Sequence, residues 1–331
     1  MPRKTFRKKI VTNELLLKVN KTNMDLVDKF LKDKATRTSN VTIKNYRSDA
    51  NIFFVWNLLN NENKLFTNIK KLELSNFFSF TTTELQWGSS RNNRVRSFLS
   101  SLSIFIEKFM DDIYPDFRNI ILKTIESVPK DMRREKTILS TEQVESLLAY
   151  LLSTDSQRAC WLALAVYSGS RFSELLRFTT DILDENHTSF GHLFMETTKQ
   201  IKTKGRGRDG KLLYKYILKD KFLPYYKRWI EDRYVLMQKN NESHNFLFIK
   251  DNGSPAAEST IRSWISSMEN HLGTNIYPHC FRHYIVTEFS KKNIPPMLIK
   301  DLLGWTSIEM VGIYDDTASK DKNWIELENL K

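Results

Sequence analysis

Apolar residues in the first 125 positions recur at intervals of three and four, a spacing that is typical of amphipathic helices. In the first such stretch, Leu26, Val27 and Phe30 fall on one helical face, and a polar residue that can cap a helix comes before them. Similar stripes follow, so we expect a compact all-helical domain of about four helices plus a short one. The predicted helices span 23–31, 42–59, 74–85, 90–110 and 117–125.

A charged stretch that contains a proline separates this half from the rest of the chain. Directly after it, Ser140 and Gln143 have the spacing of a capping box, which predicts the start of a new helix. A second domain is therefore expected from about Thr137. The predicted parts are a basic arm at 1–20, a helical domain at 21–127, a linker at 128–136 and a second domain at 137–331.

The second half is also mostly helical, but it contains one pair of predicted strands. Residues 192–201 and 212–218 have strand-like patterns on either side of a glycine-rich turn at 204–210. The fold class is therefore predicted to be mainly α with a small antiparallel β hairpin: an all-helical N-terminal domain and a mixed α+β second domain. Further helices are expected at 158–167, 172–176, 223–237, 260–272, 280–291, 296–303 and 308–314.

Composition narrows the class of protein without deciding it. The 331 residues include 51 Lys and Arg against 39 Asp and Glu, a net charge of +12, so a polyanionic partner is the first to consider. Many basic proteins, however, bind nothing acidic. Cys160 and Cys280 lie far apart, which argues for a reducing, cytoplasmic compartment and against a disulfide framework. No apolar run suggests a membrane span or a signal peptide.

Five residues form a set that suits phosphodiester chemistry. His279 and Arg282 lie three residues apart and share a helix face, Trp305 follows a Leu-Gly pair, and Tyr314 comes nine residues later. Upstream, Arg171 follows the turn Ser-Gly-Ser and opens a helix. Two guanidinium groups can hold the nonbridging oxygens of a phosphate, and a tyrosine can attack phosphorus. Each short motif alone is common on protein surfaces, so it is the ordered set that carries the interpretation.

This arrangement resembles the tyrosine recombinase (phage integrase, lambda integrase) family, in its two-domain Cre and Xer form. The likeness is specific from about Thr137 onward and weaker in the helical half. It implies a site-specific DNA recombinase in which Tyr314 attacks the scissile phosphate to form a 3′-phosphotyrosine. Arg171 and Arg282 would hold the nonbridging oxygens, and His279 would help to manage the proton of the tyrosine.

Trp305 departs from the commonest family pattern, which has a histidine after Leu-Gly. An indole donates one hydrogen bond and cannot exchange a proton at neutral pH. We therefore expect Trp305 to stabilise charge on a phosphate oxygen and to pack the tyrosine's helix, and not to act as a general base.

The family uses a lysine of the strand hairpin as the general acid for the leaving 5′-oxygen. Lys199, Lys202 and Lys204 compete for this role. Hairpins lengthen at their free tip, so a residue fixed relative to the base should lie early in the first strand. Thr198 and Lys199 also resemble the family's Thr-Lys pair. We therefore prefer Lys199, with Lys204 as its rival.

The remaining basic candidates are expected to contact DNA. Residues 91–94 read Arg-Asn-Asn-Arg, and Arg and Asn are suited to reading guanine and adenine edges in a major groove. A solvated polar face explains each of them equally well. The DNA-binding candidates are Lys44, Arg47, Arg91, Arg94, Arg96, Lys204, Arg206 and Arg208.

The partners implied by the resemblance are double-stranded DNA target sites and other copies of the chain, two on each site and four in the synapse. The two domains would clamp opposite sides of the duplex, and the tail after Tyr314 would dock on a neighbour. No Asp/Glu cluster suits magnesium and no Cys/His set suits zinc, so no metal and no cofactor is expected.

Two alternatives stay open: a type IB topoisomerase-like nicking and closing enzyme, and a DNA-binding protein that does not cut. The complete chemical set speaks against the second. The target sequence stays undetermined, as does the role in integration into DNA by a mobile element, in excision or in dimer resolution.

Overall fold

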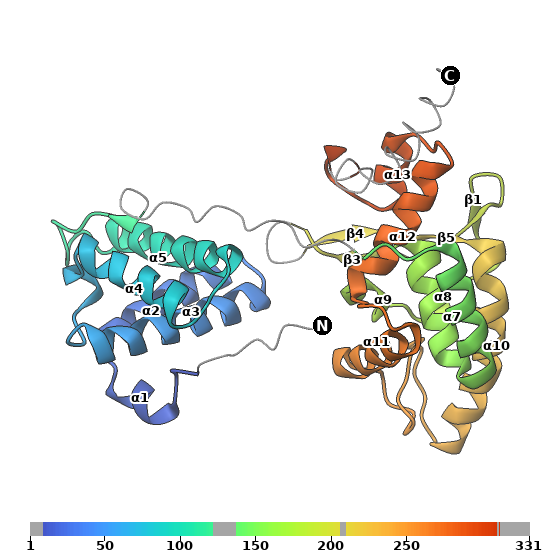
Figure 1. The fold of residues 1–331 in the computed structure, drawn as a ribbon, viewed down its shortest axis with the longest axis horizontal. Coiled ribbons are helices and arrows are strands. Elements are labelled where there is room, and N and C mark those ends of the chain that lie inside the picture. Colours follow the sequence, from blue (N-terminus) through green and yellow to red (C-terminus); the bar gives the residue numbers. More distant parts are fainter. Residues whose placement is uncertain (1–8, 122–136, 206–209, 310, 312–331) are drawn as a thin grey trace. The chain divides into compact units, whose positions relative to one another are not determined.

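The computed structural model describes residues 9–121, 137–205, 210–309 and 311, and the chain divides into two compact units (Figure 1). The first unit holds the N-terminal helices, and the second comprises Glu135–Lys204 and Gly210–Lys331. No helix within the described ranges combines the length and the apolar character needed to cross a membrane.

The first unit is helical and encloses an aromatic core. Phe30, Phe53, Phe77 and Phe98 are fully buried, and the rings of Phe53 and Phe77 meet edge to face with their centroids 4.9 Å apart. The four predicted helices are confirmed, with ends that shift by a few residues. The elements are α1 (Asn13–Lys18), α2 (Lys21–Ala35), α3 (Asn40–Asn60), the 3₁₀ helix η1 (Phe66–Asn68), α4 (Lys71–Thr83) and α5 (Ser89–Phe109).

The short helix expected at 117–125 does not begin there. Residues 117–120 are not helical, Ile121 is helical, and 122–125 lie outside the described residues. The side chain of Asn119 accepts a hydrogen bond from the amide of Ile121 (3.0 Å), as a capping residue does, so helical structure starts only after Asn119.

The second unit is built around α8 (Ser156–Ser168), a helix whose residues are almost all buried. It packs against α7, α10 and α12 (Figure 1). At the start of α7, Ser140 and Gln143 form the predicted capping box. The other elements are α7 (Thr141–Thr154), α9 (Phe172–Leu175), η2 (Thr180–Ile182), α10 (Lys219–Lys239), α11 (Glu258–Leu272), α12 (Pro278–Lys291) and α13 (Pro296–Leu302). Of the helix expected at 308–314, residues 309 and 311 are helical, and 310 and 312–314 lie outside the described residues.

The predicted hairpin is confirmed as antiparallel, but each long strand is broken into two short ones. The amide of Thr197 donates to the carbonyl of Lys215 (3.0 Å), whereas the amide of Lys215 donates to the side-chain oxygen of Thr197 (3.0 Å). The next amide, that of Thr198, turns away to the carbonyl of Ile182 (3.0 Å), so the ladder stops. The result is one antiparallel sheet in the order β1-β2-β5 and one β3-β4 pair. Their bounds are β1 (Thr188–Ser189), β2 (Phe194–Glu196), β3 (Ile201–Thr203), β4 (Lys211–Leu213) and β5 (Tyr216–Leu218).

Candidate active site

Arg171 lies in a tight turn between two helices. Gly169 ends α8 in the left-handed region (φ 57°), where a residue with a side chain is disfavoured. Arg171 then caps α9, and Glu174 accepts hydrogen bonds from both its amide (3.0 Å) and its guanidinium group (2.9 Å). Glu174 is fully buried and therefore holds both the helix start and the direction of the arginine.

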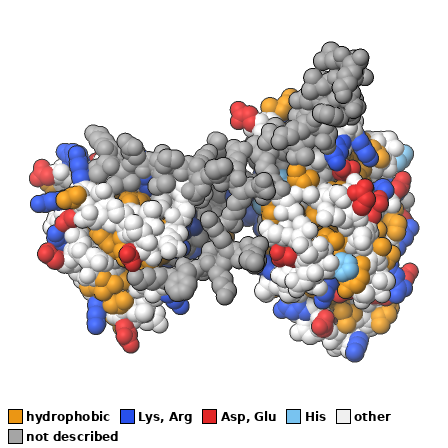
Figure 2. All heavy atoms as spheres, viewed as in Figure 1, with side chains coloured by type: hydrophobic (Ala, Val, Ile, Leu, Met, Phe, Trp, Pro, Cys, Tyr) orange, Lys and Arg blue, Asp and Glu red, His pale blue; other side chains and the backbone are white. Residues whose placement is uncertain are grey.

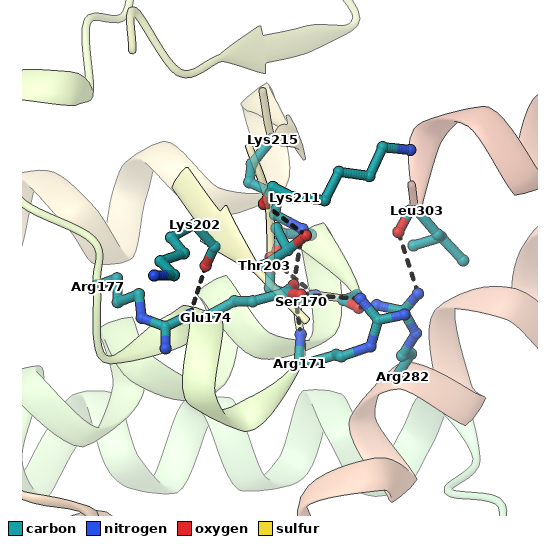
Figure 3. A network of polar contacts seen from close by, with 12 residues as sticks. Ser170, Arg171, Glu174, Arg177, Lys202, Thr203, Lys211, Lys215, Arg282 and Leu303 are labelled. Carbon is teal, nitrogen blue, oxygen red and sulfur yellow. Dashed lines mark hydrogen bonds and ion pairs between the residues drawn. The ribbon is translucent and has the colours of Figure 1, made fainter. Parts of the chain in front are cut away.

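Arg282 is buried in α12, with 2% of its surface exposed. Its Nη1 donates to the carbonyl oxygen of Gly169 (2.6 Å), and its Nη2 donates to that of Leu303 (3.1 Å) (Figure 3). The first carbonyl belongs to the turn before Arg171, and the second to the Leu-Gly pair before Trp305. One guanidinium group thus joins the three motifs that the sequence separates.

Trp305 follows a second glycine in the left-handed region, Gly304 (φ 64°). A side chain at Gly304 would run into Leu213 of β4, so the Leu-Gly turn packs directly on the small sheet. The indole of Trp305 is buried, and the guanidinium carbon of Arg282 lies 4.8 Å from its ring centre. This cation–π contact holds the guanidinium group of Arg282 against the indole ring of Trp305.

His279 lies in the first turn of α12 and is accessible from solvent. Its pKa is below the ordinary value because the surrounding protein partly desolvates the ring, and because the positive charges of Arg282, Arg171 and Lys204 disfavour the imidazolium form. At neutral pH the ring is therefore neutral and able to accept a proton.

The two lysines that compete for the role of general acid have different surroundings. The amine of Lys199 is 2.8 Å from the carboxylate of Asp181, and its side chain is 69% exposed in a surface pocket that Arg177 also lines. Lys204 follows β3 and is near enough to His279 for its charge to lower the pKa of that ring. Of the two lysines, Lys204 is the one whose charge contributes to lowering the pKa of His279, whereas Lys199 pairs with Asp181.

Sequence reasoning missed one residue beside this site, Lys215. Its amine lies 2.7 Å from Glu174, and both side chains are buried (Figure 3). Lys215 stands two residues before Ile217, whose side chain is fully buried, so strand periodicity is the signal that could have indicated an inward-facing lysine.

Three nominated residues lie outside the described residues: Tyr314, Arg206 and Arg208. The other nominated residues of the second half of the chain all lie in the second unit. They are Arg171, Lys199, Lys204, His279, Arg282 and Trp305.

The nominated cations of the helical unit are partly engaged within the protein. Arg94 makes a two-pronged contact with the buried carboxylate of Asp49 (2.9 and 2.6 Å), and Arg47 pairs with Asp28. The guanidinium of Arg91 lies 4.0 Å from the ring centre of Trp87.

Asn92 is buried and accepts a hydrogen bond from Thr81 (2.7 Å), so its side chain is engaged within the helical unit. Lys44 is exposed, and Arg96 lies on α5. On the visible face, basic and acidic side chains are interspersed over both units (Figure 2).

Comparison with known proteins identifies the family. The model of the Phage integrase family matches residues 137–321, more than half of the chain. A tyrosine recombinase of Thermosipho africanus is 24% identical over 296 residues, covering 86% of this chain and 92% of its own. The SPbeta prophage-derived recombinase-like protein YomM of Bacillus subtilis is 27% identical over 286 residues, covering 84% and 81%.

Solved structures agree on the fold. XerH recombinase bound to its difH substrate superposes with a TM-score of 0.63 at 18% identity, covering 93% of this chain and 95% of XerH. The Tn1549 transposon integrase in complex with transposon right end DNA gives a TM-score of 0.65 at 16% identity, covering 93% and 99%. The resemblance first suggested by the motifs is confirmed: the chain belongs to the phage integrase family of tyrosine recombinases, which cut and rejoin DNA.

Proposed function

We propose that this tyrosine recombinase cuts a DNA strand by attack of Tyr314 on a phosphate held by Arg171 and Arg282. The observation that carries the assignment is the position of Arg282, whose guanidinium binds the carbonyls of both Gly169 and Leu303. These contacts bring the turn before Arg171 to the helix of Arg282, so the guanidinium groups of both arginines can bind one phosphate. Such groups match the nonbridging oxygens of a phosphodiester.

In this proposal His279 accepts the phenol proton of Tyr314. A tyrosine with a pKa near 10 needs such an acceptor, and the lowered pKa of His279 keeps the imidazole neutral at pH 7. Trp305 holds Arg282 and contributes its one donor to the phosphate oxygens.

For the leaving 5′-oxygen, we propose Lys204 as the general acid in place of Lys199. The charge of Lys204 acts on His279, whereas the amine of Lys199 is bound to Asp181. A proton donor has to reach the leaving group in the same site as the attacking group. The bond energy stays in the covalent protein–DNA link, so the scheme needs neither a metal nor a cofactor.

We further propose that the protein acts on double-stranded DNA sites, with two copies on each site and four in the synapse. Support comes from relatives whose solved forms are a XerH–difH pre-cleavage complex and a lambda integrase dimer on a core site. Lys44 and Arg96 of the helical unit, together with Arg91, Arg206 and Arg208, would contribute DNA contacts. The relatives are bacterial proteins, so we place this activity in the cytoplasm.

The nucleophile is tested with a suicide substrate, a nicked duplex that traps the covalent intermediate. Tyr314→Phe is expected to bind this DNA as the unaltered protein does and to form no SDS-resistant protein–DNA complex, because phenylalanine has no oxygen with which to attack. Tyr234→Phe, at an exposed position of α10, is the matched control and should form the complex normally.

A covalent complex formed by Tyr314→Phe would exclude Tyr314 as the nucleophile. An unaltered protein that binds but never forms the complex would indicate a DNA-binding protein that does not cut. Relaxation of supercoiled DNA without exchange between two sites would indicate the topoisomerase-like alternative.

A further inference from the structure

A buried ion pair lies directly behind the phosphate-binding arginines. The side chain of Lys215 is only 4% exposed, and its amine is 2.7 Å from Oε2 of Glu174, which is itself fully buried. The roles proposed above for Arg171, Arg282, His279 and Tyr314 leave this lysine without a role.

Glu174 is shared between Lys215 and Arg171. Its Oε2 accepts hydrogen bonds from the Lys215 amine and from the backbone amide of Arg171 (3.0 Å), while its Oε1 accepts from the Arg171 guanidinium (2.9 Å). A change in the charge or position of this carboxylate would therefore alter the contacts that hold the Arg171 guanidinium (Figure 3).

Lys215 is itself held rigidly by its backbone. It lies between β4 and β5, and its amide and carbonyl pair with Thr197, which is fully buried after β2. The same small sheets carry Lys204, the proposed general acid, at the end of β3. Lys215 thus connects the strands of the general acid to the turn of the phosphate-binding arginine.

Stability alone is a weak reason for this pair, because burying two charges costs about as much as their attraction returns. Burial and the charges of Arg282 and Arg171 act to lower the pKa of Lys215, and the carboxylate of Glu174 opposes them. Apart from Glu174, the surroundings of Lys215 therefore disfavour its charged form.

The match between the charge of this cluster and the charge of the transition state supplies a different reason for the buried pair. Arg171, Arg282, Lys215 and Glu174 carry three positive charges and one negative charge, a net charge of two. A phosphodiester has one negative charge, and the pentacoordinate phosphorane formed during attack has two. Without Lys215 the charge of Glu174 would offset that of one arginine, which weakens binding of the doubly charged transition state more than binding of the singly charged ground state, and only stronger transition-state binding raises the rate.

We propose that Lys215 is a positioning residue for strand cleavage: it neutralises and fixes Glu174, so that Arg171 is held in place and keeps its full charge for the phosphorane. This inference rests on the proposed function.

The first test compares single-turnover cleavage of the suicide substrate by Lys215→Met and Lys215→Arg. Methionine keeps the length of the side chain but removes its charge, and cleavage should slow by about 100-fold, the order of loss expected for a misplaced catalytic group. The dissociation constant for DNA should change by less than about twofold, because the ground state needs less charge. Lys215→Arg, which keeps the charge, should recover most of the rate.

A second substrate separates a charge effect from a damaged fold. Replacing one nonbridging oxygen of the scissile phosphate by a methyl group removes one negative charge from the phosphorane. The deficit of Lys215→Met relative to the unaltered protein should then shrink by about tenfold or more, whereas a distorted site would lose equally on both substrates.

The double variant Lys215→Met/Glu174→Gln completes the design. A neutral glutamine no longer draws the charge of Arg171, so this variant should cut faster than Lys215→Met although it carries one more substitution. If Lys215→Met does not fold, as thermal melting would reveal, the double variant takes its place in the two-substrate comparison. Its cluster keeps the net charge of the unaltered protein, so the ratio of its cleavage rates on the two substrates should match that of the unaltered protein, and a deficit that shrinks on the methylphosphonate would contradict the inference.

Cleavage by Lys215→Met at the normal rate would overturn the inference, as would equal deficits of this variant on the two substrates. Failure of the unaltered protein to form any covalent complex would overturn the proposed function instead, so the two failures are distinguishable.

Discussion

At the scale of single residues, the choice between Lys204 and Lys199 is directly testable. Removing a general acid typically costs about 10²- to 10⁴-fold in rate, so Lys204→Ala should lose cleavage by that order while Lys199→Ala stays near normal. A 5′-bridging phosphorothiolate has a leaving group that needs no proton, and cleavage by Lys204→Ala should return on it. The measurement is single-turnover cleavage of both substrates by both variants.

The opposite pattern, with Lys199→Ala defective and rescued by the phosphorothiolate, would return the role to Lys199. The sequence favours Lys199 because it lies early in the first predicted strand, near the base of the hairpin, and forms a Thr-Lys pair with Thr198. Its amine is bound to Asp181, 18 residues earlier in the chain, and a contact of this kind is invisible to strand periodicity.

The residues of the candidate site were predictable to different degrees. Arg171, His279 and Arg282 stand at fixed spacings from glycine turns and helix starts, so local pattern was enough to nominate them. The link between Gly169 and Arg282 spans 113 residues, and no local pattern indicates it. Lys215 was missed for a related reason, because its partner Glu174 lies 41 residues away on another element.

At the scale of elements, helices were predicted well and strands only in outline. The helices have long apolar stripes, such as the one that buries Leu26, Val27 and Phe30 in α2. A stripe of this kind is recognisable in the sequence because the apolar residues that face the core recur every three or four positions. The strands are three residues long or shorter, and the side chain of Thr197 takes the place of a ladder partner. This side-chain contact interrupts a strand that the alternation of apolar and polar residues predicts to be continuous.

The turn at Gly169 gives a prediction for an element junction. A Cβ atom there would lie 2.6 Å from Leu303 and 2.7 Å from Ile285, in addition to the strain of a left-handed conformation. Gly169→Ala should therefore destabilise the second unit by about 2–5 kcal/mol, about 1–2 from the backbone and about 1–3 from overpacking. Cleavage should fall as well, because the carbonyl of Gly169 anchors Arg282.

Gly273→Ala is the matched control, measured alongside by urea denaturation and single-turnover cleavage. Gly273 also ends a helix in the left-handed region (φ 63°), but a Cβ atom there meets nothing within 4 Å. It should lose only the backbone contribution and cut DNA normally. Equal losses of stability in the two variants would show that the contact with Leu303 and Ile285 is unimportant.

At the scale of the whole molecule, the net charge of +12 predicts how binding responds to salt. If both units contact phosphates, the logarithm of the association constant should fall linearly with the logarithm of salt concentration, by roughly 0.9 per phosphate neutralised and for on the order of 6 to 10 phosphates. Binding is best measured with Tyr314→Phe, so that no covalent product forms.

Lys44→Gln should reduce that slope by about one if its exposed amine contacts a phosphate. Because Arg94 and Arg47 already pair with carboxylates, a count of basic residues overstates the charge that is available to DNA. A flat salt dependence would contradict extensive phosphate contact by the two units.

The guanidinium of Arg282 bridges segments made far apart in time during synthesis. The turn at Gly169 leaves the ribosome more than a hundred residues before Arg282, and Leu303 follows later still, so these contacts of the candidate site form only when the second unit is nearly complete. Contacts of such long sequence separation form late in folding. A chain that ends before Leu303 therefore lacks one of the two contacts of Arg282, and we expect such a chain to form no covalent complex with the suicide substrate.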